Sequence, residues 1–165
     1  MQAREQLVNW LKDAYSMEKA LVPVLENHAK DAKNHPQIEA RIRQHVDETN
    51  RHADLVRGCI ERLGGDVSTI KTGLASMFGT LKEVPMAVSS DEIVKNALAD
   101  YSTEHFEIAS YKALIATAQH VGDMETARIC QEILRDEEEM QRWLDQQLPM
   151  VVQIFLGQQT REAGA

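Results

Sequence analysis

Four long segments of this sequence carry apolar residues at every third or fourth position. That spacing places the apolar residues on one face of an α-helix, whereas a half-buried strand would alternate apolar and polar residues. The segments cover about residues 3–33, 36–64, 90–121 and 123–148. Pro36 suits the first turn of a helix, and the Gly64-Gly65 pair suits a helix end. We therefore predict an all-α chain that forms a single domain over residues 1–165.

The connections between these segments predict how the helices are joined. The first and second helices, and the third and fourth, are separated by only a few residues, so each pair should form an antiparallel hairpin. Residues 65–89 lie between the hairpins. A helix of about 28 residues is roughly 40 Å long, and an extended linker of this length spans nearly twice that distance. One long crossover is the ferritin-like connection. We predict a ferritin-like four-helix bundle, a crossover that contains a short helix, and a short tail after Pro149.

Charge and hydropathy argue against several classes of protein. The net charge of −8, with no basic arm, does not suit a nucleic-acid binder. The longest apolar run, residues 150–156, is too short to span a bilayer, and the first residues do not resemble a signal peptide. Cys59 and Cys130 lie on separate predicted helices and form no C-x-x-C motif, so we expect both to be reduced thiols in the core. We expect a cytoplasmic protein with neither nucleic acid nor membrane as a partner.

Three predicted helices each place a glutamate in the apolar stripe. On a helical wheel, Glu18, Glu104 and Glu137 lie near the centre of the stripes of the first, third and fourth helices. A buried carboxylate without a partner is costly, so each needs a strong one. Lys112 and His105 lie close enough to the third stripe to pair with one or two of these acids. Three acids at one level of the bundle are better held by metal cations, which gather several carboxylates.

The second helix offers nitrogen as well as oxygen ligands. Glu48 and His52 are four residues apart and share one flank of the helix, while His45 lies on the same side and competes with His52. Glu107 follows Glu104 by three residues and either binds metal or faces solvent. Sites built from glutamate and histidine suit iron or manganese, with zinc as a substitute, better than calcium or magnesium. The sequence therefore predicts two iron or manganese ions in the bundle.

Three motifs also resemble those of a known family. Residues 13–18 (DAYSME), 45–52 (HVDETNRH) and 104–111 (EHFEIASY) are similar to segments of the YciF-like family of ferritin-like bacterial proteins, and the similarity extends over about residues 6–148. The resemblance implies a stress-associated homodimer with a di-metal centre. It implicates as metal ligands Glu18, Glu48, His52, Glu104 and Glu137. Glu107 resembles the second acid that rubrerythrin-like proteins carry on their third helix.

The sequence departs from the ferritin-like pattern at two places. That pattern has Glu-x-x-His, whereas Glu48 and His52 are separated by one residue more. Either the helix is distorted locally, as by a π-bulge, or the ligand set differs. On the fourth helix Met140 and Gln141 stand where a histidine would follow Glu137. We therefore expect an asymmetric site in which one metal has fewer nitrogen ligands.

These observations lead to a functional hypothesis. We expect a di-metal carboxylate protein that acts on oxygen or peroxide, or that handles iron. The assigned roles are bridging for Glu48 and Glu137, terminal for Glu18 and Glu104, and completion of one metal for His52. One alternative is a metal-binding protein without catalytic activity. Another is a helical interaction protein in which buried ion pairs take the place of a metal site.

Two tyrosines are candidate catalytic residues. Tyr15 and Tyr101 each precede a candidate ligand by three residues, which is about one helical turn. They either hydrogen-bond the ligands and relay electrons, or serve as ordinary core tyrosines with a satisfied hydroxyl group.

Overall fold

The computed structural model describes residues 2–68, 70 and 91–163, and all of the regular structure in this part of the chain is helical. The helices are α1 (Gln2–Asp31), α2 (Pro36–Arg62), α4 (Glu92–His120) and α5 (Met124–Ala163). The prediction of an all-α four-helix bundle is confirmed. The boundaries differ from the predicted ones by at most two residues, except at the end of α5. The short helix predicted within the crossover lies outside the described residues.

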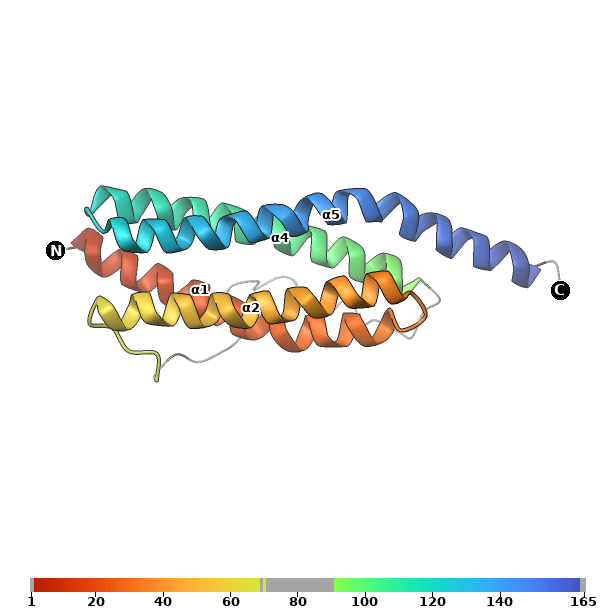
Figure 1. Ribbon diagram of the computed structural model, residues 1–165, viewed down its shortest axis with the longest axis horizontal. Coiled ribbons are helices and arrows are strands. Elements are labelled where there is room, and N and C mark those ends of the chain that lie inside the picture. Colours follow the sequence, from red (N-terminus) through yellow and green to blue (C-terminus); the bar gives the residue numbers. More distant parts are fainter. Residues whose placement is uncertain (1, 69, 71–90, 164–165) are drawn as a thin grey trace.

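The helices form two antiparallel hairpins that pack side by side (Figure 1). The α1–α2 hairpin packs on the α4–α5 hairpin through α1 against α4 and α2 against α5. α2 ends at one end of the bundle and α4 begins at the other, so these two helices run in the same direction (Figure 1). The end of α2 and the beginning of α4 thus lie at opposite ends of the bundle, as the ferritin-like prediction requires.

Local sequence explains where the helices begin and end. α2 begins directly at Pro36, whose fixed φ and missing N–H are tolerated in a first turn. Gly64 follows the end of α2 with φ +82°, and Gly122 occupies the turn between α4 and α5 with φ +75°. Glycine is favoured at both positions, because other residues rarely adopt positive φ.

The prediction that the fourth helix ends near Leu148 and is followed by a short tail is wrong. α5 continues through Pro149 to Ala163. The proline has no N–H to donate to the preceding turn, but the helix makes one buried contact directly after it. Val151 is only 2% exposed and belongs to the hydrophobic core. This packing helps to offset the lost hydrogen bond at Pro149, whereas the residues from 152 to 160 are half-buried or exposed.

The core is apolar towards both ends of the bundle and polar in its middle. Leu7 and Leu11 lie near one end of α1 and Leu25 near the other, and all three are buried. Between them lies a belt of buried polar side chains: Glu18, His45, Thr49, His52, Glu104, Glu107 and Glu137. No helix among the described residues has the length and hydropathy needed to cross a membrane.

Candidate metal centre

Six charged or titratable side chains converge in the middle of the bundle, and each helix supplies at least one. None of the six is more than 1% exposed. They are Glu18 from α1, His45 and His52 from α2, Glu104 and Glu107 from α4, and Glu137 from α5. Since each lies on the inward stripe of its helix, packing the apolar stripes together also brings these polar groups together.

The six side chains form two groups, each able to surround one cation. One group contains His45, Glu104, Glu107 and Glu137, and the other contains Glu18, His52 and Glu137. Within each group the nitrogen and oxygen atoms that would act as ligands lie within 4.8 Å of one another. In the first group, the Nε2 atom of His45 lies 2.8 Å from Oε1 of Glu104.

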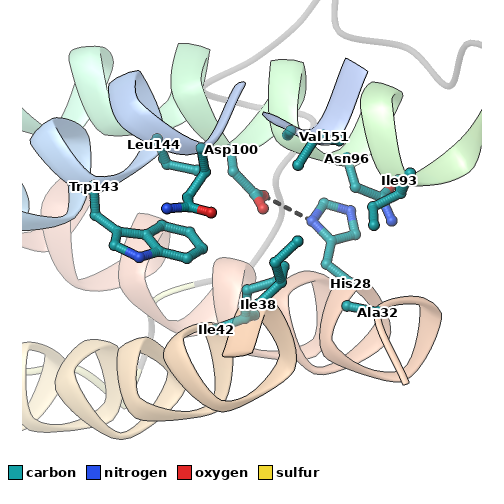
Figure 2. Close-up of a pocket in the computed structure, with 12 residues that line it drawn as sticks. His28, Ala32, Ile38, Ile42, Ile93, Asn96, Asp100, Trp143, Leu144 and Val151 are labelled. Atoms are coloured by element: carbon teal, nitrogen blue, oxygen red, sulfur yellow. Dashed lines mark hydrogen bonds and ion pairs between the residues drawn. The ribbon is translucent and has the colours of Figure 1, made fainter. Parts of the chain in front are cut away.

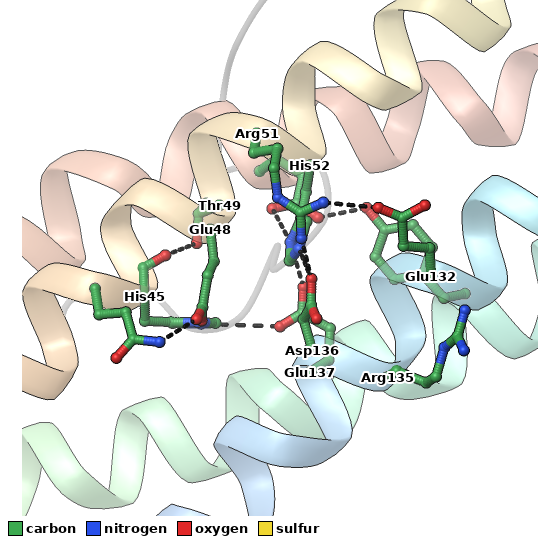
Figure 3. A network of polar contacts seen from close by, with 12 residues as sticks. His45, Glu48, Thr49, Arg51, His52, Glu132, Arg135, Asp136 and Glu137 are labelled. Atoms are coloured by element: carbon green, nitrogen blue, oxygen red, sulfur yellow. Dashed lines mark hydrogen bonds and ion pairs between the residues drawn. The ribbon is translucent and has the colours of Figure 1, made fainter.

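Glu137 belongs to both groups, and its two oxygens face different histidines. Oε1 lies 2.8 Å from Nδ1 of His52, and Oε2 lies 3.8 Å from Nε2 of His45. Figure 3 shows Glu137 of α5 facing the two histidines of α2. A carboxylate placed in this way can bind two cations at once, one through each oxygen.

The hydrogen bonding of these groups is incomplete, as expected for metal ligands. Among the described residues, these buried atoms of the cluster have no hydrogen-bond partner: Oε2 of Glu18, Nδ1 of His52, Oε2 of Glu104, Oε2 of Glu107 and both oxygens of Glu137. Nδ1 of His52 lies 2.8 Å from Oε1 of Glu137, but the two atoms lack the geometry of a hydrogen bond. No lysine or arginine of the described chain forms an ion pair with the four glutamates. The donor set therefore fits metal cations, since buried polar groups otherwise find partners.

Without cations, burial makes the carboxylates hard to ionise. Burial and the neighbouring charge of Glu137 raise the pKa of Glu18 to about 8. Burial also raises the pKa of Glu104 to about 7, although the adjacent His45 acts in the opposite direction. The pKa of Glu107 is raised well above its usual value by burial and by the charges of Glu137, Glu18 and Glu104. The acids therefore retain protons that a cation would displace.

The histidines respond to the same cluster of negative charge. Burial alone would lower the pKa of His52, but contacts with Glu137, Glu18 and Asp136 raise it to about 9. Burial likewise opposes the charged form of His45, yet Glu104 and Glu48 raise its pKa well above the usual value. In the metal-free protein, protonated imidazoles thus supply part of the positive charge that cations would provide.

A carboxylate outside the cluster orients each histidine (Figure 3). Nδ1 of His45 donates to Oε2 of Glu48 over 3.1 Å, and Nε2 of His52 donates to Oδ2 of Asp136 over 2.9 Å. Asp136 is itself held by Arg51. In a neutral imidazole the other nitrogen carries no proton, so Nε2 of His45 and Nδ1 of His52 are free to bind a cation. Carboxylate–histidine pairs of this kind commonly support metal sites.

The structure places Glu48 outside both groups, although the sequence suggested a bridging role. Its carboxylate accepts hydrogen bonds from Arg41 over 3.1 Å, from Gln44 over 2.8 Å and from His45. Burial would raise the pKa of Glu48, but these partners lower it to about 2. Glu107 faces the cluster instead, at 1% exposure. Glu48 thus lies behind His45, and Glu137 is the carboxylate that both groups share.

Comparison with known proteins places this bundle in a family. Residues 2–157 match the family described as a domain of unknown function (DUF892). The chain belongs to the DUF892 family. It is 27% identical over 137 residues to protein YciF of Escherichia coli K12, a match that covers 79% of this chain and 80% of that protein. The resemblance to the YciF-like family is thus confirmed.

Solved structures show the same fold. A protein from Xanthomonas campestris pv. campestris matches with a TM-score of 0.83 and 37% identity, over 97% of this chain and 99% of the other. The E. coli stress protein YciF matches with a TM-score of 0.74 and 22% identity, over 92% and 97%. A bacterioferritin from Desulfovibrio desulfuricans, described with a diiron site, matches with a TM-score of 0.74 and 18% identity, over 93% and 84%. The ferritin-like fold is therefore confirmed.

The nitrogen ligands of this DUF892 chain are distributed differently from the expectation. α2 is α-helical throughout Pro36–Arg62, without a π-bulge. His45 and His52 are seven residues apart, which is two turns on one face of the helix. Each candidate group therefore contains one histidine, whereas the sequence suggested one position with fewer nitrogen ligands. The groups differ instead in their carboxylates, three against two.

The tyrosine that contacts the cluster is not one of the two candidates. Tyr111 is fully buried and donates a hydrogen bond to Oε1 of Glu18. Tyr15 and Tyr101 are half-buried, and the Tyr101 ring packs against that of His105 with the centroids 4.6 Å apart. The sequence did contain a signal for Tyr111, because it follows Glu107 by one helical turn on the same stripe.

The different positions of Glu48 and Glu107 predict different losses of metal. Glu48→Gln should lower metal affinity by about 10–100-fold while both ions still bind at saturation, because Glu48 only orients His45. Glu107→Gln should remove one ion, because Glu107 belongs to a single group. Anaerobic titration with ferrous iron measures both effects, and exposed Asp47→Asn is the matched control. If Glu48→Gln loses an ion and Glu107→Gln does not, the two assignments are reversed.

Proposed function

We propose that this chain binds two iron or manganese ions in the centre of the bundle and uses them on oxygen or peroxide. The observation that carries the proposal is the position of Glu137, whose two oxygens face two histidines in the dry interior. Zinc is a plausible substitute ion, because the same ligand types accept it. Bound iron or manganese would supply electrons to oxygen or peroxide.

The residues of the two groups have separate tasks in this proposal. His45 and Glu104 would hold one ion, and Glu18 and His52 the other, with Glu137 shared between them. Glu107 would complete the first position. Mixed carboxylate and imidazole ligands of this kind suit iron and manganese.

The surrounding protein would orient these ligands and exclude water. Glu48 and Asp136 fix the ring orientation of the histidines, and Tyr111 fixes one oxygen of Glu18. Because the acids keep protons when no cation is present, loading should release protons to solvent. Burial also limits the number of water molecules that reach the ions, which leaves ligand positions for a small substrate.

The descriptions of two similar proteins support this proposal. The bacterioferritin of similar fold is described with a diiron site, and the E. coli relative is described as a stress protein. A stress-associated role, a homodimeric state and a cytoplasmic location are proposed here on the basis of the family.

One experiment separates catalysis from storage. The metal-free protein is loaded anaerobically with two equivalents of ferrous iron and then exposed to oxygen or hydrogen peroxide in a stopped-flow spectrophotometer. We expect a near-ultraviolet absorption change that is faster than iron oxidation in buffer, together with loss of the oxidant. Bound iron without either change would favour a metal-binding protein that is not an enzyme. Failure to bind iron would favour the helical interaction protein.

A further inference from the structure

A narrow cavity leads from the surface between α1 and α4 to the candidate metal centre. Its inner end is lined by the buried carboxylates of Glu104 and Glu107. Its outer end is lined by Ala99, which is exposed, and by Val24 and Thr103, which are half-buried. The cavity therefore joins the molecular surface to two of the proposed ligands.

The size of the cavity limits what can pass. The space open to the centre of a water molecule is about 30 Å³, and a single water needs about 10–15 Å³ on that measure. Two or three waters, one dioxygen or one hydrogen peroxide would fill it. A bulky organic molecule would not fit without separating the helices.

A buried pair, His28 and Asp100, forms part of the cavity wall. Nδ1 of His28 lies 2.7 Å from Oδ1 of Asp100. Figure 2 shows this contact from the side of a second cavity, which lies among all four helices and is also lined by Trp143 and Val151. That second cavity touches none of the six proposed ligands. The His28–Asp100 pair therefore borders both cavities, of which only the one between α1 and α4 reaches the candidate metal centre.

The opposite side of the centre is closed by ion pairs. Behind His45, Glu48 is bound to Arg41. Behind His52, Asp136 is bound to Arg51, which also contacts Glu132 over 2.8 Å. Between α1 and α4, by contrast, the residues that line the cavity near the surface are the short side chains of Ala99 and Thr103 and the half-buried Val24. The α1–α4 side thus has small outer residues and a cavity that reaches two proposed ligands, whereas long paired side chains fill the α2–α5 side.

We infer that the cavity between α1 and α4 is the route by which a small uncharged oxidant, dioxygen or hydrogen peroxide, reaches the metal centre. The inference rests on the proposed function and adds the direction of approach and the size limit of the substrate. Ala99 and Thr103 lie at the mouth and control its width, while Glu104 and Glu107 line the end where the oxidant arrives.

Nitric oxide, a small uncharged diatomic, tests this route without turnover. The protein is loaded with ferrous iron, and nitric oxide binding is followed by stopped-flow absorption. Ala99→Trp should slow binding by about tenfold or more, because access must then await local opening of the helices. Thr103→Phe blocks the mouth independently. Exposed Ala109→Trp on the same helix is the matched control and should leave the rate unchanged.

The outcomes separate the route from the proposed function. Nitric oxide rates within twofold of the unmodified protein in both blocked variants would overturn the route while leaving the metal centre intact. Loss of iron from both blocked variants would also overturn it, because residues at the mouth should not be needed to hold the ions. If the unmodified protein binds no iron, the proposed function itself fails.

Discussion

Glu137→Gln should empty both metal positions at once. Glu137 is the residue shared by the two groups, and each of its oxygens faces a different histidine. An amide is uncharged and its nitrogen cannot bind a cation, so the variant would lose one ligand atom outright and would bind a cation only weakly through the other. We expect affinity at both positions to fall by more than about 100-fold, the upper end of what loss of a supporting residue costs.

The same substitution should stabilise the metal-free protein. The charge of Glu137 raises the pKa of Glu18 and of Glu107, which means that these carboxylates repel one another without cations. Removing one of them relieves the repulsion, so the melting temperature of the metal-free variant should rise while metal binding is lost. A misfolded variant would show a lower melting temperature instead.

Exposed Glu139→Gln, two residues away, provides the control for Glu137→Gln. It should keep two ions per chain and an unchanged melting temperature. Metal content by mass spectrometry and thermal unfolding by circular dichroism measure both properties. Retention of even one tightly bound ion in Glu137→Gln would contradict the shared position of this residue.

The metal-free protein should lose stability as the pH rises from about 6 to 9. Glu104, Glu18 and His52 have pKa values raised to about 7, 8 and 9, so the folded state holds more protons than the unfolded chain in this range. Stability supplied by such groups is complete below their ordinary pKa values and is lost as the pH passes through the raised ones. Glu48, whose pKa is lowered to about 2, makes the stability depend on pH only under acidic conditions.

The expected fall in the melting temperature follows from these pKa shifts. Each pKa unit corresponds to about 1.4 kcal/mol, and about 1 kcal/mol moves the melting temperature of a domain of this size by about 2–4 °C. We expect a fall of about 5 °C or more in the presence of a chelator. Two equivalents of manganese should abolish the fall, because cations replace the protons. A melting temperature that rises with pH in the chelated protein would contradict the buried acidic cluster.

The sequence was sufficient for the fold and for the centre of the site. Apolar spacing and connection lengths predicted the bundle, since both follow from helix geometry. Glu18, Glu104 and Glu137 lie so close to the middle of their stripes that any reasonable packing directs them inward. The direction of these three side chains could be predicted without knowing how the neighbouring helices pack.

Residues on the flanks of the helices could not be assigned in the same way. Whether Glu48 or His45 faces the centre depends on a small rotation of α2 and on the partner that each finds. Arg41, two turns before Glu48, draws that carboxylate away, while His45 turns towards Glu104. Glu107 is directed inward by the packing of α4 on α1. These outcomes depend on contacts between helices, which periodicity within one helix does not report.

The continuation of α5 was missed for a related reason. Pro149 normally favours a helix end, and the local sequence alone supports that expectation. The helix nevertheless continues past the proline, and Val151 takes a buried position facing the other hairpin. Tertiary packing thus overrides a local preference.

The metal content of the unmodified chain tests the shared cluster most directly. The protein should be purified without chelator, supplied with ferrous iron or manganese, freed of unbound ions by gel filtration and analysed by mass spectrometry against protein concentration. Four buried carboxylates and two oriented histidines should retain close to two ions per chain. A chain that keeps no ion after this treatment, yet remains folded, would show that the cluster is held together without metal.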